Sequence, residues 1–202
     1  TAMMLQARRL RWLSPTDLLG EPRPLRHGVG AIDSWKPPVQ PPPPIRVSPG
    51  QSIQAALDRA ESGQTVEVLP GEYTEALHIR RKEVRLVGVR SDGAVIADTD
   101  QPRPTLRPID AYHAITVERV TYGTLIQGLT VDGADVGISV LGGGHSPPLA
   151  VELAQLVLTN HRKALDVDGS APLLIGSRLA NNEVGIDTRA VGSWTIEGNT
   201  FA

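Results

Sequence analysis

Residues 125–133 read LIQGLTVDG, and a similar pattern returns three times before the end of the 202-residue chain. Aligning the copies places four aliphatic anchors 27, 21 and 22 residues apart: Ile126, Leu153, Leu174 and Ile196. A repeat of roughly 20 to 50 residues is typical of a solenoid, whose units bury their apolar faces only by stacking on one another. The later copies are ELAQLVLTN (152–160), LLIGSRLAN (173–181) and TIEGNTFA (195–202).

A second set of anchors shifts by the same amounts and indicates the structure of each unit. Ile138, Leu165 and Ile186 follow the first three anchors and lie 27 and 21 residues apart. Around them apolar and polar residues alternate, which is the period of a strand with one face turned inward. The segments between the strands lack both a crossover helix pattern and the leucine-rich consensus. We therefore predict an all-β fold, a parallel β-helix in which each strand pairs with its equivalent one turn away.

Three earlier segments add a resemblance to a known group of proteins. They are SIQAAL (52–57), TVEVLPGEY (65–73) and VRLVG (84–88). Their order resembles the opening of the right-handed parallel β-helix superfamily of pectate lyases, pectin methylesterases and carbohydrate-binding and sugar hydrolase repeat proteins. The resemblance covers residues 45–202 and implies a right-handed coil, which the general rule for parallel crossovers also favours. It implies the fold rather than the chemistry, because one fold hosts many functions.

A short helix is expected to cover the first turn of this coil and to shield its edge strands from foreign pairing. Ser48 or Ser52 would supply the N-cap, and Gly63 would close the far end. A loop is expected at residues 98–108. The apolar stripe of the helix consists of Ile53, Ala56, Leu57 and Ala60. The inward-facing residues predicted for the following strands are Val66, Val68, Leu77, Ile79, Val84, Leu86, Val95, Ile96, Ile115 and Val117.

Residues 1–44 do not share the repeat and are predicted to form a basic arm ending in a proline-rich linker, followed by the β-helix domain at 45–202. The chain up to residue 47 carries seven Lys and Arg against three Asp and Glu, whereas the remainder carries 13 against 19. The arm is interpreted either as a contact for a partner or as a segment lying back across the acidic coil, and we favour the second. The proline run at 41–44 is typical of an extended spacer.

Composition excludes several classes of protein. Aromatic residues make up only 3% of the chain, so its core must be aliphatic. Cysteine is absent, and no apolar run approaches the roughly 18 residues of a membrane span. The five histidines share no metal-ligand spacing, so no metal site is predicted. We expect a secreted, periplasmic or cell-surface location, although this chain shows no signal peptide, and no nucleic-acid partner.

Polar residues beside the second anchors are the candidate site. Ser139, Asp166 and Asp187 each follow an inward anchor, so they should point outward and stack roughly 4.8 Å apart. A parallel column two positions on consists of Leu141, Asp168 and Arg189. With the two residues at the preceding corner, the candidate substrate-binding residues are Asp166, Asp168, Asp187, Arg189, His161 and Lys163.

These residue types have two interpretations. Two close carboxylates shift one another's pKa or share a cation, for which calcium is the candidate, and an adjacent Arg or Lys neutralises a uronate. Alternatively, the polar residues solvate the outer face, with Arg189 paired to Asp168 or Asp187, and we favour this reading because structural ion pairs outnumber catalytic ones. The catalytic motifs of pectin methylesterases and pectate lyases are missing, so no catalytic residue is assigned.

Two further expectations concern the turns and the end of the coil. Gly133, Asn160 and Asn181 occupy equivalent turns, where stacked Asn side chains would form a hydrogen-bonded ladder. Phe201 falls at an inward position of the last turn, and an open end of this kind exposes unpaired strand edges.

Two functions therefore remain open. The first is polysaccharide recognition on an outer face of the solenoid, with processing as a lyase, hydrolase or esterase left undecided. The second is a non-catalytic scaffold within a larger chain or assembly, with a protein partner bound through the open C-terminal coil or the N-terminal arm.

Overall fold

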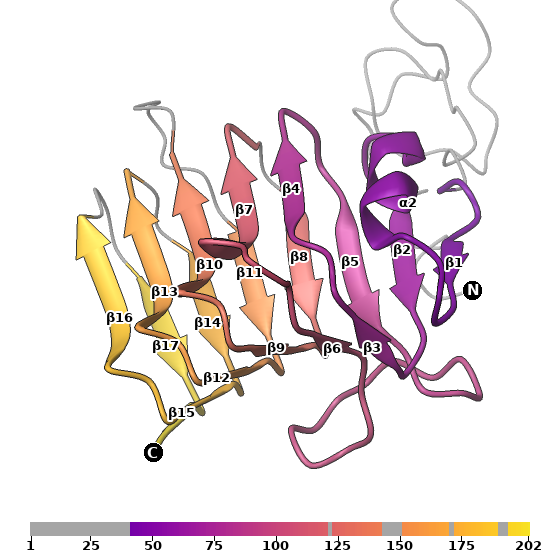
Figure 1. Ribbon diagram of the computed structural model, residues 1–202. Helices are drawn as coiled ribbons and strands as arrows, with labels where there is room; N and C mark the ends of the chain where they lie inside the picture. The colour runs from indigo at the N-terminus through magenta and orange to yellow at the C-terminus, as the bar shows by residue number, and fades with distance from the viewer. Residues whose placement is uncertain (1–40, 121–122, 143–150, 170–171, 190–193) are drawn as a thin grey trace, which may run out of the picture. The chain divides into compact units, whose positions relative to one another are not determined.

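The computed structural model describes residues 41–120, 123–142, 151–169, 172–189 and 194–202. These residues form a coil of short parallel strands with one short helix, so the predicted β-solenoid is confirmed (Figure 1). Its right-handed sense stays a prediction. The predicted arm lies almost entirely in residues 1–40, outside the described residues, and the boundary at residue 44 stays a prediction as well.

Each turn of the coil passes through three sheets, and every strand pair in them is parallel. The first sheet contains β1 (Ile45–Val47), β2 (Thr65–Val68), β5 (Arg85–Gly88), β8 (Thr124–Gln127), β11 (Val151–Ala154), β14 (Leu173–Ile175) and β17 (Thr195–Glu197). The second contains β3 (Glu72–Tyr73), β6 (Thr105–Leu106), β9 (Thr130–Asp132), β12 (Val157–Thr159), β15 (Arg178–Ala180) and β18 (Thr200–Phe201). The third contains β4 (Leu77–Arg80), β7 (His113–Glu118), β10 (Val136–Leu141), β13 (Lys163–Asp168) and β16 (Val184–Arg189).

Both sets of sequence anchors lie in register, as predicted. In the first sheet the pairing joins all four members of the first set, Ile126, Leu153, Leu174 and Ile196. In the third sheet Ile138 pairs with Leu165, and Leu165 pairs with Ile186. Ile138 and Leu165 are fully buried and belong to one continuous aliphatic core. The stacking of branched aliphatic side chains along the coil is therefore what holds successive turns together.

Left-handed residues turn the corners between the sheets. The corner between the second and third sheets uses Gly133, Asn160 and Asn181, with φ of 84°, 60° and 56°. Asn tolerates this conformation better than most residues, which explains its presence at these positions. The predicted Asn–Asn ladder does not form, because no hydrogen bond joins Asn160 to Asn181 among the described residues; the Asn160 amide donates instead to the Asp132 carboxylate of the preceding turn at 2.7 Å.

Two other asparagines bond to the backbone of the preceding turn. The Asn182 side chain accepts a hydrogen bond from the His161 backbone N–H at 2.9 Å and donates to the Leu158 carbonyl at 3.0 Å. Asn199 repeats this pattern at the corner between the first and second sheets, accepting from the backbone N–H of Ser177 at 2.8 Å and donating to the Leu174 carbonyl at 2.8 Å. Each amide thus satisfies backbone groups that the corner would otherwise leave unpaired.

The predicted cap helix is α2 (Ile53–Arg59), which contacts β1, β2 and β4 (Figure 1). Ser52 is its N-cap, since its side chain accepts a hydrogen bond from the Ala55 backbone N–H. The expected closure by Gly63 is wrong, because the helix ends at the C-cap Ala60. The Lys82 ammonium group instead donates to the last carbonyls, those of Leu57, Asp58 and Ala60. No helix of the described ranges is long and apolar enough to cross a membrane.

Two predictions for the early turns need correction. Val95 is 49% exposed, because it pairs with Val89 in an isolated antiparallel bridge that turns its side chain away from the core, whereas Ile96 is buried. The expected loop at 98–108 is interrupted by β6, whose Leu106 is buried and pairs with Tyr73 and Val131. The three prolines of that segment are typical of a loop, and for this reason the sequence did not predict the two-residue strand.

Candidate functional site

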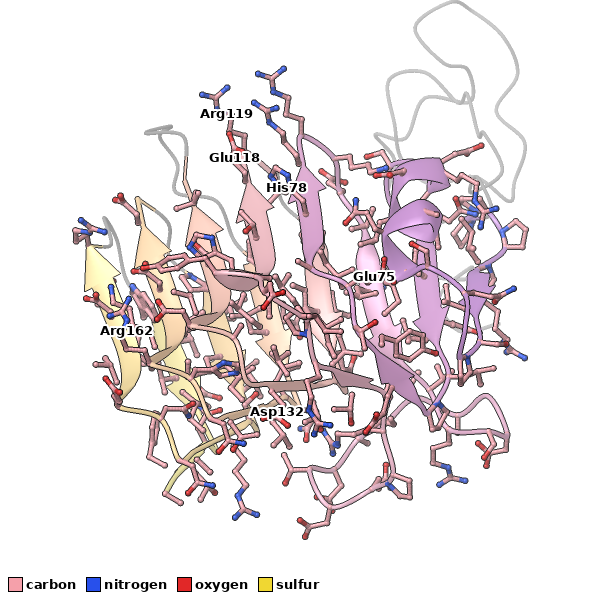
Figure 2. All side chains as sticks on the ribbon, in the orientation of Figure 1. Glu75, His78, Glu118, Arg119, Asp132 and Arg162 are labelled. Carbon is pink, nitrogen blue, oxygen red and sulfur yellow. The ribbon has the colours of Figure 1, made fainter. Side chains whose placement is uncertain are left out.

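The outer face of the third sheet carries the two polar columns that the sequence predicts. The first column runs His78, Thr116, Ser139, Asp166, Asp187 in register across β4, β7, β10, β13 and β16. The second column runs Arg80, Glu118, Leu141, Asp168, Arg189. Figure 2 shows His78 and Glu118 at the β4 and β7 end of these columns. The columns are therefore rows of side chains crossing the strands, with one strand spacing between neighbours.

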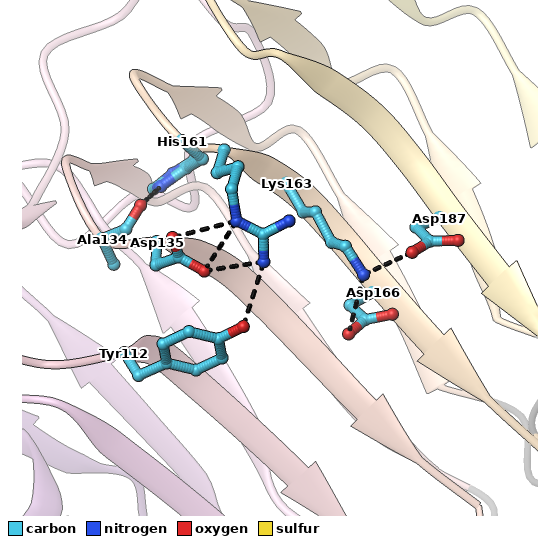
Figure 3. A network of polar contacts seen from close by, with 8 residues as sticks. Tyr112, Ala134, Asp135, His161, Lys163, Asp166 and Asp187 are labelled. Atoms are coloured by element: carbon cyan, nitrogen blue, oxygen red, sulfur yellow. Dashed lines mark hydrogen bonds and ion pairs between the residues drawn. The ribbon is translucent and has the colours of Figure 1, made fainter.

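Lys163 joins the two carboxylates at the centre of the first column. Its ammonium group lies 3.7 Å from Asp166 on the same strand and contacts the Asp187 carboxylate on the next strand (Figure 3). The Lys163 and Asp166 side chains are only 17% and 18% exposed, while Asp187 is 41% exposed. The predicted proximity of Asp166 to Asp187 is present, with a cation of the chain itself between them.

The contact between Lys163 and Asp187 favours the charged form of both groups. The hydrogen bond from Lys163 lowers the pKa of Asp187 below its ordinary value, and the same bond raises the pKa of Lys163. One oxygen of Asp166, Oδ1, is buried without a hydrogen-bond partner among the described residues. Unpaired buried acceptors are uncommon in proteins, so this oxygen is a feature of the cluster that its own contacts leave unexplained.

The second column places Asp168 and Arg189 side by side in register, and both are exposed. The ion pair expected between Arg189 and either Asp168 or Asp187 does not form within 4 Å among the described residues, although the Arg189 charge helps to lower the pKa of Asp187. Lys163 takes the place expected of Arg189. Ion pairing on the outer face is therefore present, but the cation that pairs with Asp187 is Lys163 and not Arg189.

His161 lies away from the outer face. Its side chain is buried between turns, with Nδ1 2.9 Å from the Ala134 carbonyl and Nε2 3.0 Å from the Val131 carbonyl. The ring also fills the space beside Gly137, where a Cβ would meet it at 2.9 Å. His161 and Lys163 are therefore neighbours in sequence whose side chains serve different surroundings.

An additional cluster at the start of the third sheet was missed by sequence reasoning. Arg162 binds Asp135 with Nε at 3.0 and 3.1 Å and with a terminal nitrogen at 2.9 Å, and it donates to the Tyr112 hydroxyl at 3.0 Å (Figure 3). The hydrogen bond from Arg162 lowers the pKa of Asp135. The sequence offered one signal for this cluster: Arg162 lies between His161 and Lys163, which are both candidate substrate-binding residues.

Tyr112 gives this cluster an exposed aromatic surface. The residue is 60% exposed, and its ring meets the His113 ring edge-on with centroids 4.7 Å apart. Burial lowers the pKa of His113, against the opposing charges of Asp166 and Asp135. The charges of Asp135 and Asp166 therefore both favour the protonated form of His113.

The described residues contain no group of three or more His, Asp or Glu side chains arranged to hold a metal ion. At the candidate position for calcium, the Lys163 ammonium group already neutralises Asp166 and Asp187. The arrangement can present fixed charges, hydrogen-bonding groups and one aromatic ring to a ligand that lies across the strands.

Comparisons were made with family models, with curated proteins and with solved structures, and none of them matches this chain. The structure shows a parallel β-solenoid, and the resemblance to pectate lyases and pectin methylesterases stays a prediction.

Proposed function

We propose that the outer face of the third sheet binds an extended polysaccharide. The observation that carries this proposal is the exposed Tyr112 ring, whose hydroxyl is held by Arg162 beside rows of charged side chains on paired strands. An aromatic ring offers an apolar face with a polar edge, which suits the mixed surface of a sugar ring. The rows repeat with the strand spacing, so they present side chains at regular intervals to a linear polymer.

Binding fits this face better than cleavage does. A general acid or base needs a titratable group that is free to exchange a proton with substrate. Lys163 contacts both carboxylates of the first column, and Arg162 holds the carboxylate of Asp135 through several hydrogen bonds. These groups act as fixed charges that position a ligand, so the polysaccharide is bound and released without being cleaved.

The test is calorimetric titration of the 202-residue chain with soluble neutral and acidic polysaccharides, with and without calcium. We expect heat of binding for at least one glycan, and a tenfold or greater loss of affinity in Tyr112→Ala or in the double variant Asp166→Ala/Asp187→Ala. Val95→Ala is the matched control, because Val95 is another exposed side chain, 49% accessible, on a different part of the coil. No binding by any glycan would overturn the proposal, as would equal affinity of Tyr112→Ala and the native chain.

A second candidate function is self-association through the last turn. Apolar side chains that earlier turns bury are exposed there: Val184 is 38%, Ile196 46% and Phe201 55% exposed. Beside Phe201 lies a pocket of about 310 Å³ lined by Leu179, Asn182, Gly185 and Ala202. Because α2 covers the opposite end, two copies would meet through these last turns. Light scattering should then show a dimer for the native chain and a monomer for Phe201→Asp; a monomeric native chain would overturn it.

A further inference from the structure

The corner where the chain leaves the third sheet for the first carries a second charged cluster, here called the basic corner. It consists of His78, Arg80, Arg81 and Arg119 around Glu118. Figure 2 shows Glu118 and Arg119 together at the end of β7, with His78 nearby on β4. The basic corner includes His78, Arg80 and Glu118 from the two columns of the outer face, and it lies at the opposite strand ends from Tyr112 and Arg162.

The positive charge of the basic corner exceeds what its one carboxylate neutralises. Glu118 Oε2 lies 3.4 Å from Arg80 Nε and 3.4 Å from His78 Nε2, and its Oε1 lies 3.4 Å from Arg119 Nε. The three basic side chains are each 49% exposed. Arg81, also exposed, makes no ion pair with any described residue. Two guanidinium groups and one imidazole therefore share a single carboxylate at the surface, and the Arg81 guanidinium adds a further positive charge without a carboxylate partner among the described residues.

Two of these arginines occupy backbone positions that disfavour any side chain. Arg81 and Arg119 directly follow β4 and β7 and have φ of 57° and 51°. Gly169 takes the equivalent position after β13, with φ of 65°. Each of the three N–H groups bonds to a carbonyl of the next turn, at 3.1, 3.2 and 3.3 Å. Arginine thus stands where glycine would avoid the strain, and a backbone outlier of this kind supports a role for the side chain.

The surroundings make this concentration of positive charge distinctive. After residue 47 the chain has 13 Lys and Arg against 19 Asp and Glu, so the domain as a whole is acidic. Residues 80–82 nevertheless read RRK, the longest basic run of that domain. Lys82 donates to carbonyls at the end of α2, which leaves the arginines for external contacts. In a domain with a net negative charge, a corner where basic side chains outnumber carboxylates is the kind of place that attracts an anionic group.

We infer that the basic corner binds the carboxylate or sulfate groups of an acidic polysaccharide. Guanidinium groups match two-oxygen anions with paired N–H donors, and Arg81 and Arg119 are one strand spacing apart. Single-stranded nucleic acids are bound by combining cations with aromatic platforms, and the basic corner has only the His78 imidazole as a ring. The inference rests on the proposed glycan binding for the identity of the polymer and adds that the polymer is acidic.

The substitutions that test this are Arg81→Gly and Arg119→Gly, singly and together. Glycine adopts the left-handed conformation without strain, so both variants should fold as well as the native chain. Arg178→Gln, on an exposed position of β15 in the second sheet, removes the same charge elsewhere and is the matched control. Polygalacturonate, heparin, neutral dextran and a single-stranded oligonucleotide serve as probes, titrated by calorimetry at about 50 and 300 mM NaCl.

We expect the double variant to bind polygalacturonate or heparin about tenfold more weakly, with Arg178→Gln within twofold of the native chain. High salt should weaken the native interaction and leave dextran unaffected. If the double variant bound acidic glycans as tightly as the native chain, the inference would be overturned. The proposed function would still stand if Tyr112→Ala weakened glycan binding. Oligonucleotide binding as tight as heparin binding would overturn the choice of polymer, and absence of any glycan binding would overturn both proposals.

Discussion

The Lys163 ammonium group on β13 contacts the carboxylate of Asp187 on β16, the next strand of the third sheet. Asp166, the in-register neighbour of Asp187, lies 3.7 Å from the same ammonium group. One lysine therefore allows two carboxylates to stand a single strand spacing apart, where their repulsion would otherwise raise the pKa of one of them.

Removing this lysine should be visible in the titration of its partner. In Lys163→Met the pKa of Asp187 should rise toward or above the ordinary 3.8, because the hydrogen bond from Lys163 is the main cause of its lowering. A depressed carboxyl pKa stabilises the fold above that ordinary value, and the contribution is lost as the pH falls through the folded-state pKa. Carbon-detected NMR titration measures the shift, and Arg189→Met, which removes a weaker contribution to the same lowering, should raise the pKa of Asp187 by less. An unchanged Asp187 pKa would contradict the contact.

Substitutions at two adjacent asparagines should change the free energy of unfolding by very different amounts. Asn182→Ala removes the acceptor for the His161 N–H and the donor to the Leu158 carbonyl, so it should lower the free energy of unfolding by about 1–3 kcal/mol. Asn181→Gly keeps a left-handed residue at an exposed position, with φ of 56°, and should change it by less than about 0.5 kcal/mol. Urea unfolding measures both; equal losses would show that the two side chains do not differ in role.

The core stack should respond to truncation according to burial. Leu165 is fully buried between Ile138 and Ile186, so Leu165→Ala should cost about 2–5 kcal/mol through lost burial and the cavity left behind. Asp168 lies on the same strand with its side chain exposed, and Asp168→Ala should stay within about 0.5 kcal/mol. Thermal unfolding of the two variants measures the contrast, and a small loss for Leu165→Ala would argue against the stacked core.

Neighbouring arginines offer a test of the left-handed corner that is independent of ligand. Arg81→Gly should leave the free energy of unfolding unchanged or raise it by up to about 1 kcal/mol, because glycine relieves the strain at φ of 57°. Arg80→Gly, at the last residue of β4, should lower it by about 0.5–1 kcal/mol, since glycine loses more conformational entropy in an extended strand and the contact with Glu118 is removed. Chemical denaturation compares them directly. A loss from Arg81→Gly as large as that from Arg80→Gly would contradict the strain argument.

Much of the outer face follows from the sequence because register follows from it. Once Leu165 and Ile186 stack on the inward side of the coil, Asp166 must neighbour Asp187 and Asp168 must neighbour Arg189, as they do. The prediction fails where a residue leaves the strict alternation at a corner. His161 turns into the coil and bonds to two carbonyls, and Lys163 reaches across to Asp187 in place of Arg189.

By itself, the sequence determined the coil, its register and the aliphatic core, because burial of apolar side chains depends on their spacing along the chain, and spacing can be read. Only the tertiary structure decided the partners of the charged groups, such as Arg162 with Asp135 and Tyr112, or Glu118 with three basic side chains. A long charged side chain can reach several oppositely charged neighbours from one backbone position. The corner conformations and the packing between turns determine which neighbour it contacts, and the spacing of residues along the chain does not reveal this.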